Sequence, residues 1–224
     1  MSKKKTLLTI LAVMLVCCIA VAGTLAFLTE TSDKAVVNTF TAAGGGKLID
    51  DDDNDPSDGV EGFFLKETKV KANANGSYSF VDPKEEVENN SYKVVPSTDL
   101  PKDPYVRIVG KTEIPAYLYV EVVDGLANSG LSYEMAGCWT KLDNVTGKNG
   151  GQIYVYKNGE LVTDKTAALA EIKLLDGDKI TVGDDVTIDE NGIQLKFYGY
   201  LAQATAGTPE VAFNTCFNNA GAGA

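Results

Sequence analysis

Short stretches in which apolar and polar residues alternate recur along this chain, and such alternation is typical of β-strands with one buried face. The clearest stretch covers residues 116–123, where Leu118, Val120 and Val122 are aliphatic and the positions between them carry tyrosine or glutamate. Pro115, directly before this stretch, suits the start of a strand. The pattern therefore predicts a strand over residues 116–123.

Two pairs of apolar stretches are each separated by four residues that contain Asn-Gly, a dipeptide favoured in tight hairpin turns. The two turn sequences include Asn158-Gly159 and Asn191-Gly192. Because apolar residues occupy both sides of each turn, the sequence predicts two β-hairpins, over residues 153–162 and 186–197.

Weaker signals divide the region before residue 116. Residues 63–65 and 78–81 predict short strands on either side of a turn at 73–76. Residues 82–90 are mostly polar or charged, and they predict a surface loop or one helical turn.

Helix signals are few. Residues 167–175 could form one short helix. Residues 208–210 read Thr-Pro-Glu, which is typical of a helix start, and Phe213 and Phe217 would then share one helix face. Many short strands and at most two short helices favour an all-β fold built as an antiparallel sandwich.

The beginning of the chain has the pattern of an export signal. Lysines occupy positions 3–5, an apolar run covers 7–21, and no charged residue occurs over 6–29. Such a segment is either removed as a signal peptide or kept as a membrane anchor, since about 20 apolar residues can span a bilayer.

Small residues near the end of this run favour removal. Thr24 and Ala26 stand where a signal peptidase accepts small side chains, so cleavage is expected just before Phe27. The chain is then expected to contact a membrane only before cleavage. It divides into a signal peptide (1–26), an N-terminal segment that ends in three glycines (27–46) and a sandwich domain (47–224).

Several blocks spread over the whole chain belong together as a signature. They are residues 25–31 (LAFLTET), 38–42 (NTFTA), 102–106 (KDPYV) leading into 116–122, and 198–203 (YGYLAQ) with 212–214. In this order they resemble the TasA/camelysin family of secreted proteins from Gram-positive bacteria. The resemblance implies a jelly-roll sandwich, processing by a SipW-type signal peptidase and a place in the extracellular matrix or on the cell surface.

The resemblance also implies assembly into biofilm-matrix fibres, alone or with an accessory matrix protein. In such fibres a segment freed by signal cleavage lends a strand to the sheet of the next subunit. Here the donor strand would be formed by consecutive residues of the N-terminal segment: Val36, Val37, Asn38, Thr39 and Phe40. The alternative is that these residues form the first strand of their own domain.

Other functions compete with a fibre subunit. A monomeric secreted or cell-surface adhesin or binding protein is one alternative, and a secreted hydrolase or a camelysin-like protease is the least favoured. The chain contains no histidine, which removes Ser-His-Asp catalysis and the histidine-based zinc proteases. We therefore expect no enzymatic activity.

The negative net charge of the chain limits the partners that it is expected to bind. The whole chain carries a net charge of −11, and removing the three N-terminal lysines takes it to −14. Nucleic-acid binding needs clustered lysine and arginine, so nucleic acid is not an expected partner.

An acidic loop over residues 50–58 is the one stretch rich in metal-type ligands. Asp51, Asp53, Asp55 and Asp58 could hold calcium outside the cell, but the run does not match an EF-hand. Mutually repelling carboxylates in a solvated loop are the alternative, and no other cofactor is expected.

Two cysteines, Cys138 and Cys216, remain after signal removal. They could form a disulfide in an exported protein, or stay as two buried thiols.

Overall fold

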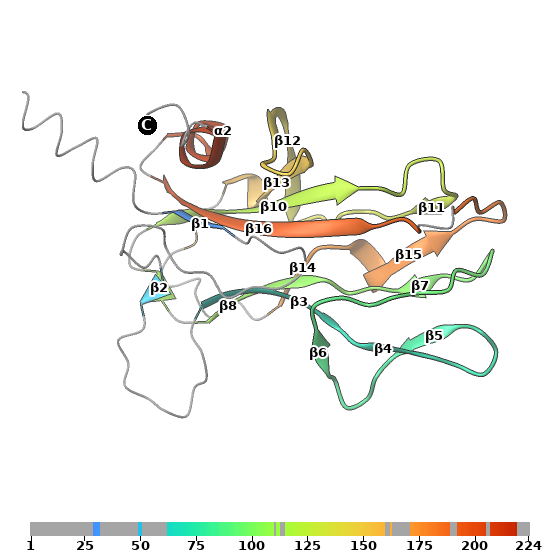
Figure 1. Ribbon diagram of the computed structural model, residues 1–224. Helices are drawn as coiled ribbons and strands as arrows, with labels where there is room; N and C mark the ends of the chain where they lie inside the picture. Colours follow the sequence, from blue (N-terminus) through green and yellow to red (C-terminus); the bar gives the residue numbers. More distant parts are fainter. Residues whose placement is uncertain are drawn as a thin grey trace, which may run out of the picture.

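In the part of the chain that the structure describes, two layers of antiparallel sheet pack together, with one short α-helix on the outer face of one layer (Figure 1). The computed structural model describes residues 29–31, 49–50, 62–109, 111–112, 115–159, 162, 171–188, 192–204 and 207–218. Every strand pair in these ranges is antiparallel. The predicted all-β sandwich with a short helix is confirmed.

The first layer is a five-stranded sheet with the order β1-β16-β10-β13-β12. Its strands are β1 (Thr29–Thr31), β16 (Leu195–Gln203), β10 (Ala116–Asp124), β13 (Gln152–Tyr156) and β12 (Trp139–Thr146). Strands from both ends of the described chain therefore meet in one sheet.

The second layer has the order β14-β8-β3-β6, and a three-stranded sheet β11-β15-β7 joins the two layers at the right-hand end in Figure 1. The strands of these two sheets are β14 (Ile172–Lys173), β8 (Tyr105–Val109), β3 (Gly62–Thr68), β6 (Glu86–Val87), β11 (Leu131–Ser132), β15 (Lys179–Val182) and β7 (Leu100–Pro101). Two small pairs complete the described strands, namely β2 (Ile49–Asp50) with β9 (Lys111–Thr112) and β4 (Val70–Ala72) with β5 (Tyr78–Phe80).

Strand β10 is the centre of the first sheet and is buried on both faces. Leu118, Val120 and Val122 point into the core between the layers, as the alternation predicts. On the opposite face Tyr119 and Glu121 are also fully buried. The strand over 116–123 is confirmed, and a second core covers its outer face.

The layers approach closely where Phe63 of β3 meets Gly199 of β16. A Cβ atom on residue 199 would lie 2.5 Å from Cζ of Phe63, inside van der Waals contact. Only glycine leaves room for the ring there, so the Phe63 side chain packs directly against the backbone of β16.

The helix predicted after residue 208 is confirmed as α2 (Pro209–Phe213), which continues into a π-helical turn, η4 (Asn214–Asn218). Its N-terminus is capped by Thr208, whose hydroxyl accepts a hydrogen bond from the Val211 N–H. The rings of Phe213 and Phe217 lie 4.9 Å apart on the face that covers the first sheet.

The hairpin predicted over residues 153–162 is wrong. A turn does form at Lys157–Gly159, but β13 pairs with β12 and β10 instead of with the residues that follow the turn. Val162 bridges Ala116 instead. Partners brought in by tertiary packing therefore outweighed the neighbour across the turn.

The hairpin over residues 186–197 is also wrong. Residues 186–188 form no strand, and Thr187 donates its N–H to the carbonyl of Ser129. Strand β16 pairs with β10 and β1. The helix suggested over 167–175 is contradicted where it is described, because Ile172–Lys173 is a strand with Ile172 buried. Residues 82–90 include the short strand β6 and no helical turn.

Candidate functional site

Most of the residues singled out from the sequence lie outside the described residues. These are the cleavage-site residues Thr24, Ala26 and Phe27, the donor segment Val36, Val37, Asn38, Thr39 and Phe40, and the acidic residues Asp51, Asp53, Asp55 and Asp58. The predictions that rest on them remain predictions.

One strand of the N-terminal segment is described, and it lies at a sheet edge. Strand β1 runs antiparallel to β16, with Thr29 opposite Ala202 and Thr31 opposite Tyr200. It stands at the end of the strand order, so β16 is its one neighbour among the described strands of that sheet. A strand bonded on one side by three residues leaves its other side open to another chain.

The disulfide considered for Cys138 and Cys216 is not present, and both residues are free thiols. Cys138 packs against the core between the layers, whereas Cys216 packs against the aromatic cluster under α2. The first sheet separates these clusters. Burial raises the pKa of both thiols, that of Cys216 to about 11, so neither is primed to react.

A buried carboxylate on the outer face of the first sheet is fully engaged. Glu121 Oε1 accepts the N–H groups of Asn149 and Gly151, each at 2.8 Å. Its Oε2 accepts the Asn149 Nδ2 group at 3.0 Å and the Tyr200 hydroxyl at 2.5 Å. Together with burial, this hydrogen bond raises the pKa of the Tyr200 hydroxyl. We call Glu121 with these partners the Glu121 cluster.

The Glu121 cluster has no space for a ligand. A Cβ atom on residue 147 would lie 2.1 Å from Cδ of Glu121, so glycine is required for the loop to close over the carboxylate. The cluster therefore ties the β12–β13 turn to the middle of the sheet.

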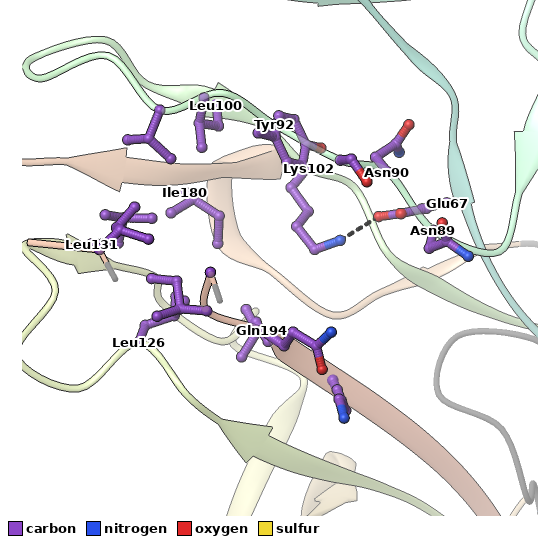
Figure 2. A pocket seen from close by; sticks show the side chains of 17 residues that line it. Glu67, Asn89, Asn90, Tyr92, Leu100, Lys102, Leu126, Leu131, Ile180 and Gln194 are labelled. Atoms are coloured by element: carbon purple, nitrogen blue, oxygen red, sulfur yellow. Dashed lines mark hydrogen bonds and ion pairs between the residues drawn. The ribbon is translucent and has the colours of Figure 1, made fainter. Parts of the chain in front are cut away.

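A cavity of about 580 Å³ lies between the layers at the end where β7, β11 and β15 meet. Figure 2 shows that one end of it is aliphatic, with Leu126, Leu131 and Ile180 around the space. At the other end stand Glu67 and Lys102. The cavity is therefore apolar at one end and ionic at the other.

The ionic end of the cavity is the buried pair of Glu67 and Lys102, which leaves one carboxylate oxygen of Glu67 unpaired. Lys102 Nζ lies 2.5 Å from Glu67 Oε2, and the two side chains are 9% and 0% exposed. Glu67 Oε1 has no hydrogen-bond partner among the described residues. Burial raises the pKa of Glu67, and the neighbouring Lys102 ammonium offsets this only in part.

Neighbouring residues hold this pair in place. Asp103 accepts hydrogen bonds from the Thr68 N–H at 2.8 Å and from the Thr68 hydroxyl at 2.5 Å. Asn90 donates one N–H of its amide to the Thr68 carbonyl at 2.9 Å, and its Oδ1 accepts the Val70 N–H at 2.9 Å. The Lys-Asp-Pro run that carries part of the family resemblance thus joins β3 to the segment after β7.

Glu67 was not predicted as a site residue from the sequence, although its spacing from its apolar neighbours indicates that it is buried. Phe63, Leu65 and Glu67 are spaced two apart on β3, which places all three on one face. Phe63 and Leu65 are fully buried, so the acid at the third position had to be buried as well. A charge at an inward strand position needs a partner, and Lys102 is that partner.

No family model, no curated protein and no solved structure matches this chain. Within the described ranges, no helix is both long and apolar enough to cross a membrane. In the same part of the chain, no three acidic or cysteine side chains are grouped closely enough to hold a metal ion.

Proposed function

We propose that this chain is a secreted structural subunit that polymerises by exchanging its N-terminal strand, in the manner of TasA/camelysin-like matrix proteins. The observation that carries the proposal is the position of β1. It begins at Thr29, close after the expected cleavage site, and pairs at a sheet edge with a strand from the other end of the chain.

The geometry gives exchange a low energetic cost. When β1 leaves its own β16, it exposes backbone N–H and C=O groups that need partners. The β1 of a second copy offers the same groups in the same register, so the pairing lost within one copy is regained between copies. Release of residue 27 from the signal peptide would give this segment the freedom to move.

Residues 36–40 would lengthen the donated strand. If β1 is donated, the residues that follow it must pass from one subunit to the next, and residues 36–40 could extend the donated strand. The three glycines at 44–46 would then act as the hinge.

The first test compares two proteins, one beginning at Phe27 and one beginning at Ser32. Electron microscopy and light scattering should find polymers only with the longer protein, and both should give the same circular dichroism spectrum. Deleting residues 27–43 should likewise abolish polymers and preserve the fold. Polymers that persist after either deletion would contradict strand exchange.

A cysteine-trapping experiment identifies the donor. In the protein that begins at Phe27, Cys138 and Cys216 are replaced by alanine, and Thr29→Cys in one preparation is mixed with Ala202→Cys in another. These positions are register partners, so exchange should produce crosslinked dimers between the two preparations. The matched control replaces Ala202→Cys with Thr140→Cys on β12, the opposite edge of the sheet.

The outcomes separate the competing functions. Crosslinks to position 202 support exchange onto β16, whereas crosslinks to position 140 would mean that β1 joins the other edge. Persistent monomers without crosslinks would favour the monomeric secreted adhesin.

A further inference from the structure

We propose that the cavity between the two layers binds a small neutral amphiphile whose head group both donates and accepts a hydrogen bond, such as an aliphatic primary amide. This inference does not depend on strand exchange. It rests on the size of the cavity, on its two unlike ends and on an unused oxygen of a buried carboxylate.

The size suits a small organic molecule. Ligand cavities usually span roughly 300 to 1,000 Å³, and this one measures about 580 Å³. It opens between secondary-structure elements that come from both layers, which is a common place for such sites.

The aliphatic end suits a hydrocarbon chain. Leu100 on β7, Leu131 on β11 and Ile180 on β15 face the space, with Leu126 and Leu195 beside the first layer. A saturated chain placed among them would be stabilised by removal of its apolar surface from water.

The ionic end suits a head group of mixed character. Glu67 Oε1 is buried and unpartnered, so it can accept a hydrogen bond from a ligand. Lys102 Nζ has three N–H bonds, and its one described hydrogen bond is to Glu67 Oε2, so it can donate to a ligand oxygen. A primary amide carries both the N–H and the C=O that this arrangement needs.

Charge decides against ionic ligands. Three charged side chains line the cavity: Glu67 and Lys102, which are buried and balance each other, and Lys196, which is half-buried. A carboxylate or ammonium bound beside the buried pair would bring an uncompensated charge there. A neutral head group avoids that cost. The pair therefore selects for polarity without net charge.

The experiment uses three probes with the same hydrocarbon chain: octanamide, octylammonium and octanoate. Calorimetry and NMR titration of the protein beginning at Phe27 should show saturable binding of octanamide. The two ionic probes should bind at least about tenfold more weakly, which corresponds to about 1.4 kcal/mol. The largest chemical-shift changes should fall on β3, β7 and β15.

Two variants test the two ends of the cavity. Leu131→Trp fills the aliphatic end from its rim and should weaken octanamide binding by at least about tenfold. Val211→Trp places the same ring at a residue that is 49% exposed on α2, and should leave binding unchanged. Glu67→Leu combined with Lys102→Met removes the hydrogen-bonding groups of the ionic end, and should weaken octanamide binding by at least about tenfold.

Several results would overturn the proposal. One is the absence of saturable binding by octanamide up to its solubility limit. Equal affinity for the three probes in the unmodified protein would show that the ionic pair does not select the head group. Unchanged binding in a folded Leu131→Trp variant would place the probe elsewhere.

Discussion

Two buried glutamates in this protein are stabilised in different ways, one by neutral hydrogen-bond donors and the other by a cation. Glu67 and Glu121 each have a fully buried side chain on a strand of one of the two layers. Glu121 is surrounded by neutral donors, whereas Glu67 is paired with a cation.

The difference lies in how completely each carboxylate is satisfied. All four hydrogen bonds to Glu121 come from groups held by the sheet and the turn beside it, and both of its oxygens are used. Glu67 has one strong partner and an unused oxygen beside a cavity. A buried charge can thus be part of the scaffold or a component of a site, and the count of its partners distinguishes the two.

Removing the cation beside Glu67 should have the largest effect. Lys102→Met leaves a buried carboxylate without its counter-charge, which should lower the free energy of unfolding by about 3–5 kcal/mol. Urea denaturation followed by the fluorescence of Trp139, the one tryptophan, measures this loss. The double variant Glu67→Leu with Lys102→Met should recover most of it, since no charge is then buried. A double variant as unstable as the single one would contradict this account.

Changing Glu121 to its neutral isostere should have a somewhat smaller effect. Glu121→Gln keeps an acceptor for the two backbone N–H groups but turns an amide NH₂ toward donors. We expect a loss of about 1.5–3 kcal/mol, the range for hydrogen bonds to charged groups. The exposed Glu134→Gln is the matched control and should change stability by less than about 0.5 kcal/mol. Equal losses in both would show that the Glu121 cluster does not stabilise the fold.

Adding a side chain in the tight space beside Glu121 should lower the free energy of unfolding by about 1–3 kcal/mol, as overpacking usually does. Gly147→Ala drives a methyl group into the carboxylate and should displace it from its donors. The control is Gly137→Ala, where nothing lies within 4 Å of the added Cβ. Thermal unfolding of the two variants should show a lower midpoint for Gly147→Ala alone, and equal midpoints would be evidence against close packing at residue 147.

The smallest expected effect is the influence of Glu67 on how the free energy of unfolding depends on pH. The pKa of Glu67 is raised in the folded protein, so the folded state holds its proton at a pH where the unfolded chain has lost it. The contribution of Glu67 to stability is therefore greatest below the ordinary carboxyl pKa, and is lost as pH rises through the raised value. Unfolding free energies from pH 4 to pH 7 should fall relative to those of the Glu67→Leu, Lys102→Met variant. A relative rise over this range would reverse the assigned direction.

The sequence predicted the parts of this fold that depend on local pattern. Alternation over 116–123 gave the central strand, and the Thr-Pro-Glu start with phenylalanines four apart gave α2. In both cases the decisive residues are close together in the chain, so one window of sequence contains the whole signal.

The parts that failed depend on partners far away in the chain. An Asn-Gly turn forms at residues 158–159, yet β13 bonds to β12 on one side and β10 on the other. Lys102 and Glu67 are 35 residues apart, and only the pairing of the strands brings them together. No local pattern contains that information. The acid at an inward strand position did indicate, however, that Glu67 would be buried and would need a partner.

The pairing of β1 with β16 also sets an order of events in time. Residues 29–31 are made early, whereas residues 200–202 are among the last described residues to be made. The sheet edge cannot close before residues 200–202 have been made, and closing so long a loop is entropically slow. Each newly made molecule therefore passes through a period in which its first strand has no partner of its own. During that period, an already folded neighbour competes with the unfinished remainder of the same chain.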